Sequence, residues 1–563
     1  MRGAGASLAT TWRASTRAGA ALLRAGGGPS APPRGGPRAG APAPGPAGRG
    51  GPGRGGRAGS ASGSASASAA ASKSTSTKTS STASTAASRG LAAAASAAAA
   101  AEAAAAARPC VVETLKARGL LQDCTGEAAL RAAAGEGAPL KVYCGFDPTA
   151  DCLHLGNLLG ILVLAWFSRC GHDVVALVGG ATGRVGDPSG KSAERPVLDV
   201  AAIEHNARCI GALLEDLLGR AAAGAAGRGG GFALANNLDW YGGMELLDFL
   251  RGVGKFARMG TMLGKDSVKT RLASEAGLSF TEFSYQLLQG YDFAHLYREA
   301  GVNVQVGGSD QWGNILAGTD LIRKLHPAGG EDAAQEEGKA AGGGAHGLTF
   351  PLLLTADGKK FGKSEGGALW LRADKLSPYK FYQYLFATPD ADVAKFLRML
   401  TFLNLDEIAA LEASMAAEGS RPNTVQRRLA EEVTRFVHGE EGLQLALNAT
   451  AALAPGSKTV LDAPTLAAIK DDVPNSPLAR AEVVGAPLAD VMAKCGIQPS
   501  KAAARRMIKG GGVRVNNTRV TEDDYALADA DVLRAEGGNP SEAQLGLVLV
   551  TAGKKNKHLV TVE

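Results

Sequence analysis

The sequence predicts an α/β fold built on a parallel sheet, because short strand-like runs alternate with helical patterns. Three short runs predict strands, two of them rich in valine: KVYCGF (141–146), DVVALV (173–178) and VNVQV (302–306). The apolar run LHLGNLLGILVLAWFSRC (153–170) predicts a helix that ends at Gly171, and helical periodicity returns after the third strand. In such sheets, ligands collect beyond the carboxyl ends of the strands.

The first part of the chain differs sharply from the rest in charge. Residues 1–101 contain twelve Lys and Arg residues and no acidic residue. From Glu102 onward, 48 basic residues stand against 54 acidic ones, a net charge of −6, although the whole chain carries +6. A basic, acid-free, Ser- and Ala-rich leader is typical of organellar transit peptides. We expect residues 1–107 to be a disordered transit region for the chloroplast, the mitochondrion or both; an untargeted low-complexity tail is the alternative.

Composition also constrains the environment of the mature chain. No later run reaches the ~18 apolar residues that a membrane-spanning helix needs, so we expect no membrane partner. The seven cysteines are odd in number and scattered, which indicates a reducing compartment without a disulfide framework or structural zinc.

The composition and periodicity of the chain predict three domains and a linker after the leader. Two low-complexity pieces, 221–231 and 328–346, are expected to be expanded surface loops. Beyond Ser377 the pattern is mainly helical, with an apolar stripe at Val425, Leu429, Val433 and Val437. The predicted boundaries are an α/β domain at 108–376, a helical domain at 377–455, a linker at 456–487 and a small α+β domain at 488–563.

The stretch YCGFDPTADCLHLGN (143–157) follows the first strand and opens a helix. Free backbone N–H groups at a helix start favour phosphate, and Gly156 would let a flat adenine approach the backbone. We therefore expect His154 and Thr149 to donate to phosphate oxygens. A histidine that only caps the helix is the alternative.

A second basic signal lies in ADGKKFGKSEGG (356–367), where Lys359, Lys360 and Lys363 are surrounded by glycines. Mobile ammonium groups suit a polyphosphate whose charge changes during a reaction. A solvated turn is the alternative for such a loop taken alone.

Two helical patterns carry further polar groups. Tyr285, Gln289 and Asp292 fall at i, i+4 and i+7 on one helix face, where they either converge on a small ligand or face water. Residues 494–519 contain seven Lys and Arg residues and no acid. The helix predicted at 500–510 either contacts an RNA backbone or is a solvated basic helix. Its candidate RNA-binding residues are Lys501, Arg505, Arg506 and Lys509.

Taken together, these segments resemble the bacterial and organellar tyrosyl-tRNA synthetases, which are class I aminoacyl-tRNA synthetases. HLGN (154–157) corresponds to the HIGH signature of the family and KFGKS (360–364) to its KMSKS signature. The similarity continues through SFTEFSYQLLQGYDF and GGSDQWGNI to the end of the chain. The resemblance implies a Rossmann-type catalytic domain with a connective insertion, a helical anticodon-binding domain, a small RNA-binding domain of ribosomal-protein type, and a homodimer.

The resemblance also implies residue roles. The ammonium group of substrate tyrosine would be held by Asp187, Tyr285 and Gln289. Its phenol would be bound by Tyr143 and Asp292, and its carboxylate would lie near Gln311. ATP would be held at its phosphates by Thr149 and His154, and at adenine and ribose by Cys144, Asp147, Gly156, Asn157 and Asp310. The departing pyrophosphate would be held by Lys191, Arg195, Lys360, Lys363 and Ser364.

The implied reaction activates L-tyrosine with ATP and transfers it to the terminal adenosine of tRNA(Tyr). Thr149, His154, Lys360 and Lys363 would be catalytic through positioning and charge stabilisation, without a nucleophilic side chain. Mg²⁺ would arrive on the phosphates of ATP, with no metal ligands from the protein and no prosthetic group. Two alternatives stay open: a tryptophanyl-tRNA synthetase, and a catalytically inactive RNA-binding relative.

Overall fold

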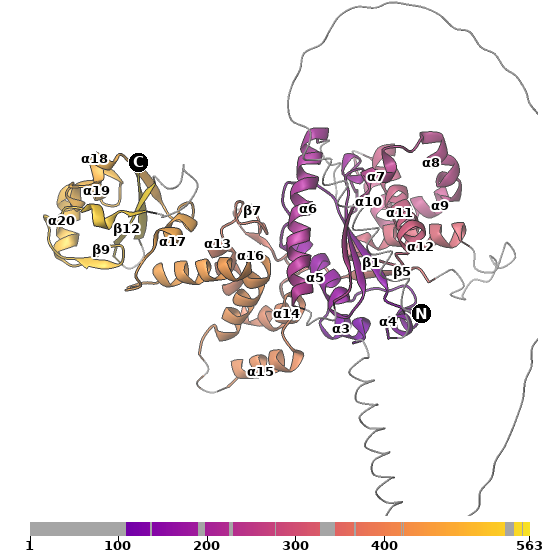
Figure 1. Cartoon of the computed structure of the whole chain (residues 1–563), viewed down its shortest axis with the longest axis horizontal. Coiled ribbons are helices and arrows are strands. Elements are labelled where there is room, and N and C mark those ends of the chain that lie inside the picture. The colour runs from indigo at the N-terminus through magenta and orange to yellow at the C-terminus, as the bar shows by residue number, and fades with distance from the viewer. Residues whose placement is uncertain are drawn as a thin grey trace, which may run out of the picture. The chain divides into compact units, whose positions relative to one another are not determined.

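The structure is a computed structural model in which most of the chain after the leader is described (Figure 1). The predicted transit region lies outside the described residues. The described residues are 109–135, 138–189, 198–224, 229–275, 277–326, 344–364, 367–417, 419, 421–534, 545–553 and 556–563.

A five-stranded sheet, all of it parallel, forms the centre of the first domain. Its strand order is β3-β2-β1-β4-β5, so the predicted α/β class is confirmed. The chain order reverses between β1 and β4, the place where such sheets bind ligands. The strands are β1 (Lys141–Phe146), β2 (Asp173–Val178), β3 (Phe232–Asn236), β4 (Val304–Gly308) and β5 (His346–Phe350).

Helices cover both faces of this sheet. Alternate strand residues point to opposite faces, so Val142 and Cys144 of β1 join one hydrophobic cluster, while Tyr143 joins another with Phe293. The first face is covered by α5 (Leu155–Arg169) and α6 (Val200–Ala223), and the second by α11 (Phe280–Ala300) and α12 (Trp312–Leu325).

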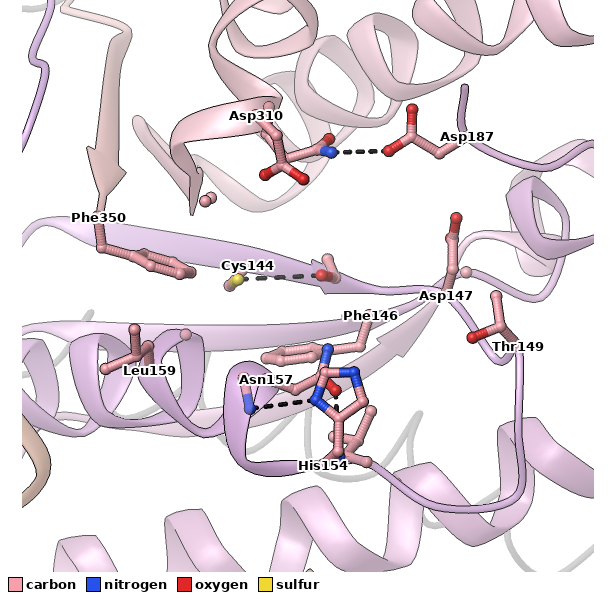
Figure 2. A pocket seen from close by; sticks show the side chains of 18 of the residues that line it. Cys144, Phe146, Asp147, Thr149, His154, Asn157, Leu159, Asp187, Asp310 and Phe350 are labelled. Atoms are coloured by element: carbon pink, nitrogen blue, oxygen red, sulfur yellow. Dashed lines mark hydrogen bonds between the residues drawn. The ribbon is translucent and has the colours of Figure 1, made fainter. Parts of the chain in front are cut away.

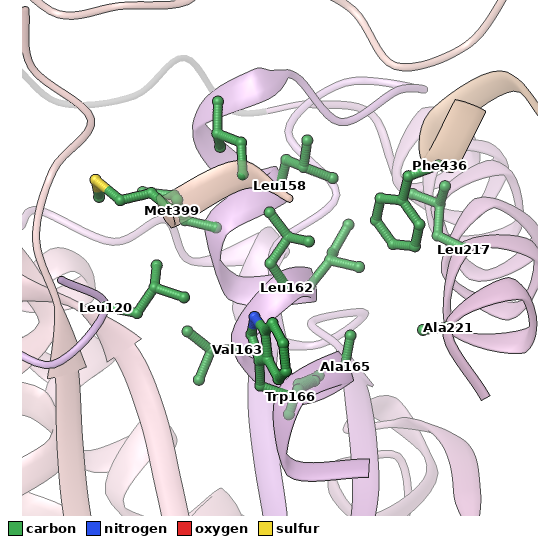
Figure 3. Close-up of a cluster of buried hydrophobic side chains, with 14 of the residues drawn as sticks. Leu120, Leu158, Leu162, Val163, Ala165, Trp166, Leu217, Ala221, Met399 and Phe436 are labelled. Carbon is green, nitrogen blue, oxygen red and sulfur yellow. The ribbon is translucent and has the colours of Figure 1, made fainter. Parts of the chain in front are cut away.

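Helix α5 explains why the run at 153–170 is apolar nearly all round. Leu158, Leu162 and Trp166 lie in a core shared with α6 and with helices from beyond residue 377, including Met399 and Phe436 (Figure 3). A helix that is buried on every side exposes no face to water, so it needs no polar stripe. Burial of this helix therefore ties the sheet to the helical segment that follows.

Smaller elements complete the first domain. Helix α6 continues to Ala223, so the predicted loop at 221–231 begins later than expected. The elements are α3 (Val111–Ala117), α4 (Glu127–Gly135), η1 (Thr182–Arg184), α7 (Leu238–Tyr241), α8 (Leu246–Gly252), η2 (Gly254–Phe256), α9 (Met259–Leu263), α10 (Asp266–Leu272), η3 (Ser309–Gln311), β6 (Lys363–Ser364) and β7 (Gly367–Ala368).

The segment after residue 377 is helical, as predicted. Val425, Leu429, Val433 and Val437 are all buried, which confirms the apolar stripe. The helix that carries them is interrupted at Gly439, where φ is 73°. The helices are α13 (Pro378–Phe386), α14 (Asp390–Leu400), α15 (Leu405–Met415) and α16 (Thr424–Ala452).

The last domain is an α+β unit around a second sheet, ordered β10-β9-β12-β13-β8, with β11 paired to β12. The predicted hairpin at VRVNNTRV is confirmed: Asn516 and Asn517 have φ values of 46° and 67° between two antiparallel strands. Ser500 caps α20 by accepting from Ala503 N–H at 3.2 Å, again as predicted.

One expectation needs correction, because the segment 456–487 is not a plain linker. Strand β8 pairs in parallel with β13, so the small domain includes residues well before 488. The elements are α17 (Ala463–Ala468), β8 (Asn475–Leu478), α18 (Arg480–Val483), α19 (Leu488–Lys494), α20 (Lys501–Lys509), β9 (Val513–Val515), β10 (Thr518–Val520), η5 (Asp529–Asp531), β11 (Leu533–Arg534), β12 (Gly546–Ala552) and β13 (Asn556–Val562).

Among the described helices, none combines the length and the apolar character that crossing a bilayer requires.

Candidate active site

A cavity of about 470 Å³ opens where β1 and β4 end. This volume suits a small-molecule or nucleotide ligand. Figure 2 shows Asp187 and Asp310 on one side of the strand ends, and His154 and Asn157 on the other. The structure brings these predicted residues together in its lining: Tyr143, Cys144, Asp147, Thr149, His154, Gly156, Asn157, Asp187, Tyr285, Gln289, Asp292, Asp310, Gln311, Lys360 and Lys363.

Consecutive residues of β1 divide the cavity between the two faces of the sheet. Tyr143 points toward α11, whereas Cys144 points toward α5, where its Sγ lies 3.2 Å from the position a side chain at Gly160 would take. Burial raises the pKa of the Cys144 thiol to about 12, so it stays protonated. Cys144 thus lines the cavity from the α5 side, and Tyr143 from the α11 side.

The end of the cavity near α11 is built to recognise a hydroxyl group. The Tyr143 hydroxyl is buried and, among the described residues, has no hydrogen-bond partner. The Asp292 carboxylate, 2% exposed, accepts from Asn237 Nδ2 at 3.0 Å and from Trp240 Nε1 at 2.9 Å. A buried polar group without a partner is costly, so this end of the cavity is complementary to a ligand that supplies one.

Burial raises the pKa of Asp292 to about 7, against the donations from Asn237 and Trp240 that lower it. A phenol that donates to this carboxylate binds the ionised form. The KM for a phenolic substrate should therefore fall about five- to tenfold between pH 6 and pH 8. Steady-state kinetics between pH 6 and pH 8 measure this KM, and Asp292→Asn, which cannot titrate, is the control. A flat profile, or an equal slope in Asp292→Asn, contradicts the assignment.

The same shift has a consequence for folding. The Asp292 carboxyl binds its proton more tightly in the folded chain than at its ordinary pKa of 3.8. Its contribution to stability is therefore complete below about pH 4 and is lost as the pH rises through about 7.

A second polar cluster, around Asp187, also lines the cavity. Asp187 Oδ2 accepts from Gln311 Nε2 at 2.7 Å, and Asp187 Oδ1 accepts from the Ser189 N–H at 3.0 Å. Asn314 Nδ2 contacts Gln289 Oε1 at 3.0 Å and Asp187 Oδ1 at 3.4 Å. These contacts fix the oxygens of Asp187 and Gln289 in place, and acceptor oxygens of this kind suit an ammonium group.

Tyr285 is oriented by Asp147, which lines the same cavity. Its hydroxyl donates to Asp147 Oδ2 at 2.7 Å, and Thr182 Oγ1 donates to Asp147 Oδ1 at 2.7 Å. Because the Tyr285 proton is committed, the lone pairs of its oxygen are left to accept from a ligand. Asp147 therefore positions Tyr285, and its predicted place near adenine or ribose stays a prediction.

At the start of α5, His154 caps the helix, and its predicted contact with phosphate stays a prediction. Its Nδ1 accepts from the Gly156 N–H at 3.1 Å, and Asn157 Oδ1 accepts from the His154 N–H at 3.1 Å, which forms a capping box. With Nδ1 as acceptor, the proton of the neutral ring lies on Nε2, which becomes a donor. A Cβ at Gly156 would lie 2.9 Å from the His154 ring, so the close approach requires glycine.

In the lysine-rich loop at 356–367, Phe361 and Gly362 are buried, whereas Lys360 and Lys363 are exposed. The Phe361 ring is buried against Phe396, with centroids 4.3 Å apart. Gly362 has φ of 97°, and a Cβ there would lie 3.1 Å from Leu155. In Phe361-Gly362, which departs from the family signature, Phe361 thus packs the loop against α14 and Gly362 lies against α5, while Lys360 and Lys363 line the cavity.

Three predicted residues lie outside this description. Lys191 and Arg195 fall within 190–197, and the side chain of Ser364 is likewise not among the described groups. Within the described part of the chain, no group of three or more His, Cys, Asp or Glu side chains is arranged to hold a metal ion.

Sequence reasoning missed several residues of the site: Thr182, Asn237, Trp240 and Asn314. Asn237 and Trp240 follow β3, which was not predicted, so the polar NNLDW segment had no strand end to mark it. Asn314 lies in the segment GGSDQWGNI, but nothing in the periodicity distinguishes it from a surface residue.

Comparison with known families shows the class of the chain. A family described as "tRNA synthetases class I (W and Y)" matches residues 136–454, and the "Tyrosine--tRNA ligase SYY-like C-terminal domain" matches residues 465–538. With its parallel sheet and two signature segments, the chain belongs to the class I aminoacyl-tRNA synthetases.

Individual relatives narrow the class. The chloroplastic/mitochondrial tyrosine–tRNA ligase of Arabidopsis thaliana is 53% identical over 457 residues, covering 81% of this chain and 84% of the relative. The tyrosine–tRNA ligase of Protochlamydia amoebophila is 47% identical over 450 residues, covering 80% and 98%. A C-terminally truncated mitochondrial tyrosyl-tRNA synthetase from Aspergillus nidulans matches with a TM-score of 0.53 and 32% identity, covering 60% of this chain and 92% of that one. Within the class, the chain belongs to the tyrosine–tRNA ligase family.

Proposed function

We propose that the cavity joins L-tyrosine to ATP, giving tyrosyl-adenylate and pyrophosphate, and that the tyrosyl group then passes to tRNA(Tyr). One observation carries the proposal: the buried Tyr143 hydroxyl, which no described residue pairs, lies at the same cavity end as the Asp292 carboxylate. A substrate phenol would accept from Tyr143 and donate to Asp292. Tryptophan, whose indole has no hydroxyl, would leave Tyr143 unsatisfied.

The side chains position two ligands that react with each other. Asp187, Gln289 and Tyr285 hold the ammonium, so the tyrosine carboxylate faces the helix start at His154. That carboxylate attacks the α-phosphorus of ATP in line with the departing pyrophosphate. His154 Nε2 and Thr149 donate to the phosphoryl oxygens, and Lys360 and Lys363 balance the growing charge on pyrophosphate. Mg²⁺ is bound by the ATP phosphates and enters with the substrate.

Charging of tRNA tests the whole reaction. The full chain, incubated with ATP, labelled tyrosine and a tRNA(Tyr) transcript, should form labelled tRNA. No label with tyrosine, but label with tryptophan on its own tRNA, would replace the proposal with the rival synthetase.

Helix α20 supports an RNA-binding role for the last domain. Arg505, Arg506 and Lys509 are exposed, whereas Lys501 is ion-paired with Asp490 at 2.8 Å. No ion pair found between described residues includes Arg505, Arg506 or Lys509. The three unpaired cations would contact tRNA phosphates, and Lys501 would contribute less.

Neutralising those three cations should weaken tRNA binding without touching adenylate formation. The Arg505→Ala/Arg506→Ala/Lys509→Ala variant should raise the KM for tRNA about tenfold or more. The slope of log binding constant against log salt concentration should become less steep by about 2 to 3. Lys501→Ala is the matched control and should have a small effect. Unchanged charging in the triple variant would remove the RNA role from α20.

We also propose a homodimer. Seven of the ten large apolar side chains that are exposed among described residues lie between 246 and 280. Clustering of this kind marks an interaction surface. The residues are Leu246, Leu247, Leu250, Met259, Leu263, Leu272 and Phe280.

Phe280 is 78% exposed at the start of α11, and it offers a direct test of that surface. Phe280→Asp should convert a dimer to a monomer in sedimentation equilibrium, because a charge buried in an apolar interface is strongly unfavourable. Val460→Asp, at a site 92% exposed and outside the surface, should leave the mass unchanged. A wild-type chain that sediments as a monomer refutes the proposal.

We propose import into the chloroplast, the mitochondrion or both, supported by the acid-free leader and by the chloroplastic/mitochondrial Arabidopsis relative. A fluorescent protein fused after residue 107 should accumulate in an organelle. Diffuse cytosolic fluorescence would contradict the proposal.

A further inference from the structure

His295 makes a contact that the reaction described above does not use. Its ring stacks on the indole of Trp240, with centroids 4.5 Å apart and planes inclined by 20°. The same indole donates from Nε1 to Asp292 Oδ1 at 2.9 Å. A chain of contacts therefore runs from His295 through Trp240 to Asp292, the carboxylate proposed to bind the substrate phenol.

The helix that carries Trp240 is much shorter than the helix that carries Asp292 and His295. Trp240 lies on α7, a helix of four residues with no side-chain cap, and its indole is only partly buried. Asp292 and His295 lie three residues apart on α11, a helix of 21 residues capped by Ser279. Residues at this spacing share one helix face. The long helix thus presents both the acceptor for the indole N–H and a flat surface for the indole ring.

The stacking depends on the shape of the His295 ring more than on its nitrogens. Nδ1 is buried and has no hydrogen-bond partner within the described part of the chain. Burial, with Arg298 nearby, lowers the pKa of His295, so the ring that faces Trp240 is neutral at neutral pH. A flat apolar ring of similar size should therefore replace it.

We propose that His295 is a positioning residue for phenol recognition, which holds Trp240 so that its Nε1–H stays aligned on Asp292 and tyrosine is preferred over phenylalanine. This inference rests on the proposed function, since it assigns a role within the tyrosine-binding end of that cavity. His295 acts through Trp240 and contacts no reacting atom.

The test compares His295→Ala and His295→Phe in amino-acid-dependent ATP–pyrophosphate exchange. His295→Ala should raise the KM for tyrosine about three- to tenfold, the range that loss of an aromatic pair gives. Its KM for ATP, and its kcat/KM for phenylalanine, should stay at wild-type values, so the preference for tyrosine falls by the same factor. His295→Phe should restore the wild-type KM.

Two controls separate positioning from structure. His326→Ala removes another histidine near an aromatic ring, 5.6 Å from Tyr297, and should not change the preference. In a Trp240→Phe background, which keeps a ring but lacks the N–H, His295→Ala should have no further effect on the preference. If the single alanine variant is unstable, His295→Phe still tests the inference, because it must keep the wild-type KM and preference.

Failure of the proposed function and failure of the His295 inference give different results. If the wild-type chain shows no tyrosine-dependent exchange, the proposed function is wrong. If exchange is present and His295→Ala keeps the wild-type preference, or if His295→Phe is impaired equally, the inference alone is overturned. An effect of His295→Ala that persists undiminished in the Trp240→Phe background overturns it as well.

Discussion

Replacing Asp292 with alanine is expected to lower kcat/KM for tyrosine activation by about a thousandfold, or ~4 kcal/mol. The substitution leaves the substrate phenol without an acceptor, and it also strands Asn237 Nδ2 and Trp240 Nε1 in a buried site. Phenylalanine, which lacks the hydroxyl, should lose little. The ratio of the two kcat/KM values in pyrophosphate exchange measures the effect.

Loss of a buried carboxylate also affects stability, so a matched control is needed. Asp472 has a side chain 4% exposed and pairs with Lys380 at 3.0 Å, outside the cavity lining. Asp472→Ala should lower the unfolding midpoint while keeping the preference for tyrosine. A parallel loss for tyrosine and phenylalanine in Asp292→Ala would make Asp292 a structural residue.

Replacing His154 with alanine should slow adenylate formation by about 30- to 1000-fold, or ~2–4 kcal/mol, with little change in the KM for tyrosine. The donor at Nε2 contributes in the transition state, whereas the acceptor at Nδ1 caps α5. Single-turnover formation of tyrosyl-adenylate measures the chemical step directly.

Two further substitutions divide the roles of His154. His154→Asn keeps a side-chain acceptor at the cap and loses the distal donor, so it should be stable but slow. His154→Gln places an amide nitrogen near the position of Nε2 and weakens the cap, so it should retain more rate at lower stability. The opposite order, with Asn fast and Gln slow, would make His154 a capping residue only.

The strands that the sequence predicted are those whose pattern is local. β1 and β2 appear with the predicted bounds, because each is a short, largely buried stretch: β2 contains three valines, and β1 places Val142, Tyr143, Cys144 and Phe146 in the interior. The third prediction, 302–306, is shifted to 304–308 because the glycines after Val306 still pair with β5. β3 and β5 were missed because each follows a low-complexity insertion and is too short to show a period.

Side chains of the site were predictable where a motif marked them and unpredictable where the fold alone gathers them. Tyr285 and Asp292 share a helix face that the sequence shows directly. Asn237 meets Asp292 across 55 positions of sequence, a contact set by the order of strands in the sheet. The interruption of the supposed linker by β8 has the same origin, because its partner β13 lies at the far end of the chain.

Amino-acid-dependent ATP–pyrophosphate exchange tests the central claim, that one cavity joins tyrosine to ATP. The full chain, supplied with each of the twenty amino acids in turn, should exchange with tyrosine and exclude phenylalanine by several orders of magnitude. Exchange with tryptophan but not tyrosine, or with no amino acid at all, would contradict the account.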